Sequence, residues 1–270
     1  MATTATDIWG YRGLIANLTS REVKVKYKRS ALGWMWSLIN PAATLAIYTI
    51  VFSSLLRVDP PVAGDGHTKS FAIFLFAALV PWGFFSNVAN GSMVQMVANG
   101  PLLKKVYFPP ACPIIALALA TLIQTGLEAV ILLVVLTIAG LLTVKVLLLI
   151  PILVLLSLFA LGIGLILGLG NVYYRDVNYL FGILLNMLFY ATPIVYPLSF
   201  VPEEAGGLPM RTLVTCNPLT QFVGAARDVT YLQQVPSAGR MGAMVAAAAI
   251  SLVVGWKVFD RRARDLSEEL

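Results

Sequence analysis

Hydrophobic positions along this chain gather into long, nearly uninterrupted runs, and not into the alternating or striped patterns of a water-soluble domain. A bilayer core about 30 Å thick needs about 20 apolar residues in helical conformation. Six runs come close to that length or exceed it, and we expect each to cross a membrane: residues 38–56, 71–93, 114–142, 146–172, 179–196 and 241–259. The pattern therefore predicts an all-α integral membrane protein with six transmembrane helices.

The remaining segments are arranged around these runs as parts of one domain. Gly140 and Lys145 mark a short turn, so we expect the third and fourth spans to form a tight hairpin. We predict a single transmembrane domain over residues 1–270, divided into a cytoplasmic interface segment (1–36), spans one to five (38–196), an external loop (197–240), span six (241–259) and a cytoplasmic tail (260–270).

Lysine and arginine positions predict the orientation in the membrane. Thirteen of the 19 precede the first span, lie in the loops after the second and fourth spans, or lie at the end of the sixth span and in the tail. The other six are in the three remaining loops: Arg57, Lys69, Lys145, Arg211, Arg227 and Arg240. Cations close to the ends of spans are retained on the cytoplasmic side. An even number of spans places both termini on one side, so we expect both to be cytoplasmic.

The segment before the first span is strongly basic and aromatic. Residues 21–29 hold five cations, and Trp34 and Trp36 follow at once. Val23 and Val25 alternate with lysines, which is the period of a strand. We nevertheless expect an amphipathic helix lying on the membrane, because an isolated strand there would leave backbone groups unpaired.

Composition agrees with a membrane protein and excludes some other classes. The chain is 59% hydrophobic and only 12% charged, whereas a soluble domain carries about a quarter charged residues. The net charge of +6 does not indicate nucleic-acid binding, because the cations lie beside apolar spans. The polar first residues lack the apolar core of a signal peptide, so we expect insertion through the spans themselves. Cys112 and Cys216 fall on opposite sides of the membrane in this topology, and we expect no disulfide.

The third span carries a polar stripe. Thr121, Gln124, Thr125 and Glu128 share one helical face, and an ionisable group in hydrocarbon is costly unless it is paired or beside water. The stripe should therefore face protein or a cavity. Two interpretations stay open: a helix–helix contact in which neighbours satisfy Glu128, or a channel wall or proton site.

The fourth span is rich in small residues. Ala160, Gly164 and Gly168 recur at four-residue intervals, with Gly162 and Gly170 nearby. Small residues at this spacing let helix backbones approach closely, so we expect tight packing. The run is not a phosphate-binding loop, because it lacks the Lys-Ser/Thr that such a loop needs.

The loop between the second and third spans is bracketed by Gly100-Pro101 and Pro109-Pro110 and carries Lys104 and Lys105. Two interpretations stay open. The loop is either a compact element that presses on a soluble partner protein, or a basic loop whose cations only reflect its position on the cytoplasmic side.

The long external loop contains a predicted short helix. Asn217-Pro218 is typical of an N-cap followed by proline at the first helical position. One face then carries Leu219, Phe222, Val223, Ala226 and Val229. This helix is too short to span, so it should lie at the outer interface or dip back into the protein.

Residue types needed for catalysis are missing. The sequence contains no GxxxxGK[ST] loop for ATP, and its single histidine, His67, has no partners for a nucleophilic triad. No acidic or Cys/His cluster suggests a metal site. We therefore expect no enzyme activity, no metal and no cofactor in this chain.

In these features the chain resembles the permease subunits of type-2 ABC exporters of polysaccharides. This family includes exporters of O-antigen, capsule, teichoic acid and mycobacterial galactan. The resemblance covers nearly the whole length. Its most specific parts are Arg21-Glu22, Tyr27 to Gly33, Trp36, Asn40-Pro41, Arg175-Asp176-Val177, Thr192-Pro193-Ile194, Tyr196-Pro197 and Asn217-Pro218-Leu219.

The resemblance implies a homodimer in the bacterial cytoplasmic membrane, joined to two copies of a separate ATPase that binds ATP and Mg, with a lipid-linked glycan as cargo and no nucleic acid. The residues implied to couple to the ATPase are Arg21, Glu22, Lys24, Leu103, Lys104, Lys105, Val106, Tyr107 and Phe108. Lys28 and Arg29 are expected to meet phosphate or lipid headgroups.

The family's channel runs largely between spans one and five, and short helices before span six form its outer gate. The channel-lining candidates implied here are Trp36, Tyr48, Phe52, Phe181, Phe189 and Tyr190, and the gate candidates are Pro218, Leu219 and Phe222. A type-2 exporter of drugs or lipids remains an alternative. A secondary transporter is a weaker one, because Glu128 is nearly alone as an intramembrane carboxylate.

Overall fold

The computed structural model describes the chain except for residues 1–4, 28–34, 52–59, 107 and 263–270. The described residues form helices joined by turns. In chain order these are α1 (Ala5–Gly10), α2 (Arg12–Tyr27), α3 (Trp36–Thr49), α4 (Phe71–Ala98), α5 (Gly100–Lys105), α6 (Cys112–Ile138), the 3₁₀ helix η3 (Val144–Leu148), α7 (Leu149–Tyr173), α8 (Val177–Ala191), the 3₁₀ helix η4 (Leu198–Phe200), α9 (Met210–Cys216), α10 (Pro218–Thr230) and α11 (Ala238–Arg262).

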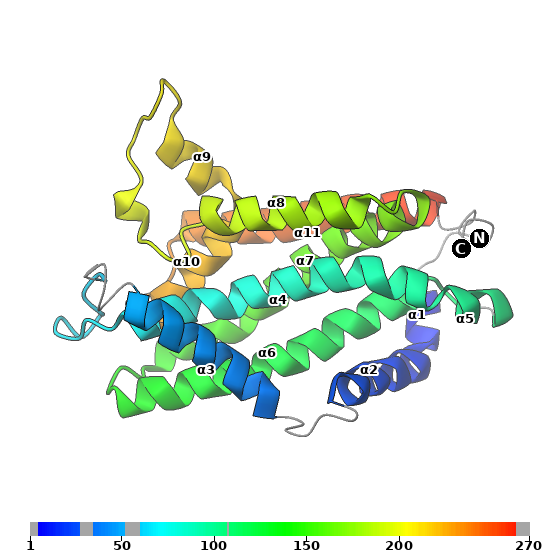
Figure 1. Cartoon of the computed structure of the whole chain (residues 1–270), viewed down its shortest axis with the longest axis horizontal. Helices are drawn as coiled ribbons and strands as arrows, with labels where there is room; N and C mark the ends of the chain where they lie inside the picture. The colour runs from blue at the N-terminus through cyan, green and yellow to red at the C-terminus, as the bar shows by residue number, and fades with distance from the viewer. Residues whose placement is uncertain (1–4, 28–34, 52–59, 107, 263–270) are drawn as a thin grey trace.

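Four of the described helical segments are long and apolar enough to cross a membrane: α4, α6, the η3–α7 segment Val144–Tyr173, and α11. They run roughly along the long axis of the molecule, as α8 does (Figure 1). The sequence predicted six spans, and four are confirmed at this length. The expected span 179–196 instead holds the shorter apolar helix α8, with 15 residues. The expected span 38–56 begins within α3, which has 14 residues, and residues 52–56 lie outside the described part of the chain.

The fifth run ends early because of a proline. Helix α8 stops at Ala191, and Thr192 is extended, with φ −99° and ψ 132°. A residue before proline is disfavoured in the helical region, and Pro193 follows here. The prediction that this span continues to Tyr196 is therefore wrong. The second run is longer than expected, since α4 continues past Met93 to Ala98 and accommodates Pro81.

The hairpin after α6 forms as predicted. Gly140 adopts φ 70°, which only glycine enters without strain. Its N–H bonds to Thr137 O at 3.2 Å, and Leu141 N bonds to Leu136 O at 2.8 Å. This pair of bonds is the Schellman ending of a helix, so Gly140 ends α6 and turns the chain toward η3.

Helix α7 is the centre of the bundle and packs extensively on α4 and α11. Gly164 faces Ser92 of α4, and Gly162 lies against the backbone of Ser251 in α11. The Ser251 hydroxyl donates to Phe159 O at 2.8 Å. The predicted close packing of the small residues in this span is therefore confirmed, and it involves two faces of the helix.

The two ends of the bundle carry different elements. Helices α1 and α5 and the C-terminal end of α11 lie at one end, whereas α9, α10 and the loop between α8 and α9 lie at the other (Figure 1). Helix α10 dips back among α4, α7 and α11. The apolar face predicted for it is fully buried, which confirms the re-entrant alternative: Leu219, Phe222, Val223, Ala226 and Val229.

Candidate functional site

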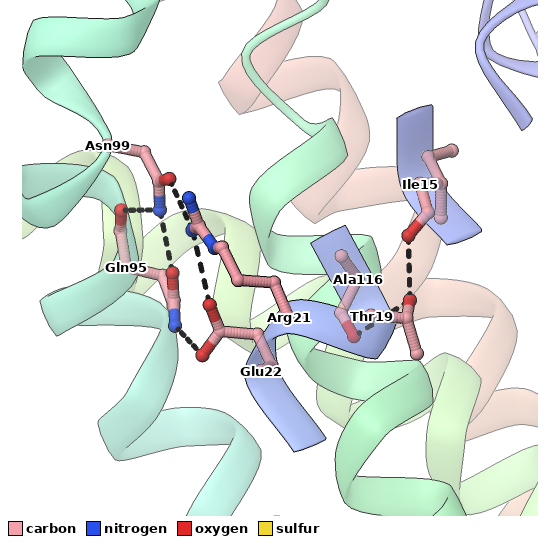
Figure 2. Close-up of polar contacts among 7 residues, drawn as sticks. All are labelled: Ile15, Thr19, Arg21, Glu22, Gln95, Asn99 and Ala116. Atoms are coloured by element: carbon pink, nitrogen blue, oxygen red, sulfur yellow. Dashed lines mark hydrogen bonds and ion pairs between the residues drawn. The ribbon is translucent and has the colours of Figure 1, made fainter. Parts of the chain in front are cut away.

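Helix α2 packs against α6, and side-chain polar contacts join it to α6 and to the end of α4 (Figure 2). The predicted helix is confirmed over Arg12–Tyr27, and the strand-like alternation of valine and lysine does not decide the conformation. Buried Thr19 bonds to Ile15 O in its own helix at 2.8 Å and to Ala116 O of α6 at 3.3 Å. A hydroxyl thus fixes the middle of α2 to the backbone of α6.

Arg21 and Glu22 connect α2 to the end of α4. Figure 2 shows both side chains reaching toward Gln95 and Asn99. Arg21 Nη2 donates to Asn99 Oδ1 at 2.8 Å, and Gln95 Nε2 donates to Glu22 Oε2 at 2.5 Å. Asn99 Nδ2 donates to Gln95 Oε1 at 2.7 Å, and Arg21 pairs with Glu22 at 3.2 Å. We call these four residues the α2–α4 clamp.

Asn99 also forms the joint between α4 and α5. It is the residue that follows α4 and precedes α5, with φ −93° and ψ 2°. Its backbone carbonyl accepts from Leu102 N and Leu103 N, both at 3.0 Å. One buried asparagine therefore connects α5 through its backbone and α2 through its side chain. A displacement of α5 would reach α2 directly.

The last turn of helix α5 is basic and exposed, whereas Phe108, which follows it in the chain, is buried. Lys104 and Lys105 are exposed in its last turn, where cations complement the helix dipole. Phe108 is buried in a cluster with Ile15 and Leu18 of α2. The two lysines are therefore accessible to another protein, while Phe108 packs against α2.

A cavity of about 260 Å³ opens between α2, α4 and α6. Thr121 and Gln124 of the predicted polar stripe line it, together with Glu22 of the clamp and Asn87 of α4. Its walls therefore mix hydrogen-bonding groups with aliphatic side chains.

The polar stripe of α6 faces protein and this cavity, as predicted. Thr121 and Thr125 are buried, and Gln124 and Glu128 are half-buried. Gln124 Nε2 donates to Glu128 Oε1 at 3.4 Å. A neighbour on the same helix thus contacts the carboxylate, as the packing interpretation expects.

At the opposite end of the molecule, α10 begins as the sequence predicted. The Asn217 side chain accepts from Leu219 N at 3.0 Å, and Pro218 is the first helical residue. The same side chain donates to Thr192 Oγ1 at 3.0 Å, in the turn after α8. The cap therefore also joins α10 to that turn.

Further along α10, two charged side chains are buried. Arg227 is 6% exposed and donates to the backbone carbonyls of Phe74, Pro193 and Ile194. Asp228 is 4% exposed and pairs with Arg240 at the start of α11. From the sequence, Arg227 and Arg240 counted only as loop cations, and the pattern did not predict these buried contacts.

The loop before α4 packs on the end of α10. Buried Tyr231 donates from its hydroxyl to Pro61 O at 2.7 Å and accepts from Ser70 N at 3.1 Å. Within this loop, hydrogen bonds from the side chain and backbone of Thr68 and from His67 N lower the pKa of exposed Asp65 to about 2. The loop thus has its own internal turn and a fixed position on α10.

The channel-lining candidates divide into two groups. Phe181 is buried in the main hydrophobic core, and Phe189 makes an edge-to-face contact with Trp82 of α4 at 5.5 Å. Tyr190 and Trp36 are 68% and 50% exposed. Phe52 and the side chain of Tyr48 lie outside the described residues.

Among the coupling candidates, Lys24 and Val106 are exposed, Leu103 is half-buried, and Tyr107 lies outside the described residues. The phosphate or headgroup candidates Lys28 and Arg29 also lie outside the described residues. Arg21 and Glu22 bond to Asn99 and Gln95 within this chain, and their expected coupling to an ATPase stays a prediction. Sequence reasoning missed Gln95 and Asn99, although two amides four residues apart at the end of an apolar helix were a usable signal.

Over the described part of the chain, no group of three or more His, Cys, Asp or Glu side chains is placed to hold a metal ion. The arrangement as a whole offers side-chain contacts between α2, α4 and α6 and a polar cavity beside them.

Comparison with known proteins assigns a family to this arrangement. The family model described as ABC-2 type transporter matches residues 14–231. This range includes α2, the α2–α4 clamp, the bundle up to α8, and α10.

Three relatives match nearly end to end. The O-antigen export system permease protein RfbA of Myxococcus xanthus is 28% identical over 265 residues, which cover 98% of each chain. A protein of the same name from Klebsiella pneumoniae is 26% identical over 254 residues, 92% of this chain and 91% of the relative. The polysialic acid transport protein KpsM of Escherichia coli is 25% identical over 246 residues, 90% of each chain.

Proposed function

The chain belongs to the ABC-2 type transporter family, and from that premise we propose that it is the permease subunit of an ATP-driven exporter that moves a polysaccharide across the bacterial cytoplasmic membrane. The observation that carries the proposal is the match to O-antigen and polysialic acid export proteins over 90% or more of both lengths. These names favour a glycan over a drug or a membrane lipid as cargo.

The ATPase in this proposal is a separate polypeptide that binds ATP and Mg, present in two copies beside a homodimer of this chain. Support comes from the absence of a phosphate-binding GxxxxGK[ST] loop in the sequence. The exposed lysines at the tip of α5 and the clamp behind it are suited to receive motion from such a partner. The cargo is a glycan carried on a lipid, with the sugar chain passing through the protein and the lipid remaining in the bilayer.

The proposed transport path lies between α3 and α8 and their copies in the second subunit. Exposed Trp36 and Tyr190 support this placement, since aromatic faces suit sugar rings. Helix α10 closes the outer end. In this arrangement α1, α5 and both chain termini are cytoplasmic, in line with the positions of the cations.

Transport would proceed by transmitted motion. ATP binding draws the two ATPase subunits together and moves α5; Asn99 passes the displacement to Arg21 and Glu22 on α2. Helix α2 leads in the sequence to α3, so its movement shifts one wall of the path.

The experiment that tests the function is deletion of the gene in the source cells. We expect lipid-linked glycan to accumulate in the cytoplasmic membrane, detectable by mass spectrometry of lipid extracts, and the surface glycan to disappear. Restoration requires this chain together with its ATPase. Unchanged surface glycan and no accumulated intermediate would contradict polysaccharide export.

The coupling role of α5 has its own test. Lys104→Glu together with Lys105→Glu should reduce recovery of the ATPase with the permease, or leave ATP hydrolysis without export, because reversed charges at the tip repel a surface built to meet cations. The matched control is Lys145→Glu, a lysine at the opposite end of the bundle that contacts Gln233 O. Normal complex recovery with normal export would exclude α5 as the docking element.

A further inference from the structure

Arg227 is a buried cation whose hydrogen-bond partners are neutral backbone carbonyls. Its Nε donates to Phe74 O at 3.0 Å, and its two terminal nitrogens donate to Pro193 O and Ile194 O. The guanidinium carbon lies 3.6 Å from the centroid of the Phe74 ring. Among the described residues no carboxylate pairs with it, since neighbouring Asp228 pairs with Arg240.

Two of the carbonyls that it meets, those of Pro193 and Ile194, belong to the turn that follows α8, and Ile194 is fully buried there. The third, Phe74 O, belongs to α4. The chain has left the α8 helix before this turn because of Pro193. A buried carbonyl without a donor is costly, and a guanidinium has donors on one plane that can serve two carbonyls at once. Lysine, with a single compact ammonium group, reproduces that geometry poorly.

A second contact joins the same turn to the beginning of α10. Asn217 donates to Thr192 Oγ1 at 3.0 Å while it caps the helix. The turn after α8 is therefore held from both parts of α10, by Asn217 at its start and by Arg227 close to its end.

We infer that Arg227 is the positioning residue that makes α10 move as one body with the end of α8 during export. This inference rests on the proposed function, in which α8 lines the path and α10 closes its outer end. Helix α10 then moves together with α8 and does not move independently of it. The residue acts through backbone carbonyls and needs no contact with the cargo.

The first experiment tethers the two elements. Thr192→Cys and Asn217→Cys are introduced into a chain carrying Cys112→Ala and Cys216→Ser, and the complex with its ATPase is oxidised with copper phenanthroline. Because the elements move together, the disulfide should form at the same rate without nucleotide and with ATP plus vanadate. Cells with the oxidised tether should export within about twofold of reduced cells. Loss of export on oxidation, regained on reduction, would overturn the inference.

The second experiment removes the guanidinium. In the same double-cysteine chain, Arg227→Gln should make the rate of disulfide formation depend on nucleotide by at least about threefold. In the unoxidised state it should lower export at least about tenfold while ATP hydrolysis continues, and oxidation should restore export. Arg227→Lys should fall between the two. Normal export by Arg227→Gln, or lost export that oxidation does not restore, would overturn the inference.

The matched control is Arg211→Gln on α9. This arginine also donates to a backbone carbonyl, Val201 O at 3.1 Å, but its side chain is 42% exposed. The Arg211→Gln variant should leave the rate of disulfide formation and the level of export unchanged. If Arg227→Gln fails to fold, the tether with Arg227 intact still tests whether the two elements move together, and Arg227→Lys tests the part played by the guanidinium. The disulfide rates involve no cargo, so the inference is measurable even where the polysaccharide export assay fails.

Discussion

At the scale of single residues, the α2–α4 clamp explains why a basic surface helix contains one acidic side chain. Glu22 lies among cations, yet its carboxylate accepts from Gln95 and pairs with Arg21. Its side chain is 20% exposed, so solvent screens these contacts only in part. The adjacent Arg21 and Glu22 thus fix both the position and the rotation of α2 on α4.

The clamp predicts non-additive effects in a double-mutant cycle. Glu22→Ala and Gln95→Ala should each lower the free energy of unfolding by about 1–3 kcal/mol, since each leaves a part-buried polar partner unsatisfied. The double variant should be hardly worse than either single one, with a coupling energy of about 0.5–3 kcal/mol. Unfolding of the purified chain in mixed micelles measures all three.

The control for that cycle is Arg12→Ala, an exposed cation on the same helix that contacts Trp9. It should be nearly neutral. Additive losses from Glu22→Ala and Gln95→Ala would mean that the two side chains do not act together.

At the scale of elements, backbone contact between α7 and α11 organises the bundle. A Cβ added at Gly255 would lie 2.2 Å from Gly162 O, and one added at Gly162 would lie 2.3 Å from the backbone of Ser251. Without a strong hydrophobic drive between helices in lipid, such close approach supplies much of their association. The two helices therefore depend on glycine at this crossing.

Gly255→Ala should destabilise the protein by at least about 1–3 kcal/mol, because the added methyl group meets backbone and the helices must separate. Gly242→Ala on the same helix is the matched control, since its Cβ would meet nothing within 4 Å. That control should be neutral or slightly stabilising, as alanine is the better helix former. Equal melting temperatures for the two variants would contradict the close crossing.

At the scale of the whole molecule, the two ends of the bundle have different tasks in the proposed mechanism. One end carries α1, α5 and the clamp, which receive motion, and the other carries α9 and α10, which close the path (Figure 1). The two cysteines report on these ends. Cys216 is exposed at the end of α9, and Cys112 is buried at the start of α6.

Membrane-impermeant maleimide added to intact spheroplasts should therefore label the chain at Cys216, because the proposed topology places α9 outside. Cys216→Ser should abolish the labelling, and Cys112→Ala should leave it unchanged. Labelling that requires permeabilised membranes would reverse the orientation and place α9 and α10 in the cytoplasm. Mass spectrometry of the labelled peptides identifies the site.

Much of this architecture followed from local pattern in the sequence. The long apolar runs predicted α4, α6, α7 and α11 because burying a helix in hydrocarbon requires length and few charges, both of which are readable locally. The cap at Asn217 and the turn at Gly140 were equally readable, because each depends on the chemistry of a few adjacent residues. The family resemblance from short motifs is likewise confirmed.

Contacts between distant segments were decided only by the tertiary structure. The sequence marked Arg21 and Glu22 as candidates for a partner protein, and only the fold shows that they also contact Gln95 and Asn99. It marked Arg227 as one cation in an external loop, and the fold buries it against carbonyls after α8. A side chain's charge and helical face can be known from its neighbours in sequence. Its partner depends on which helices pack together, and that is set by the shape and close contact of whole helices.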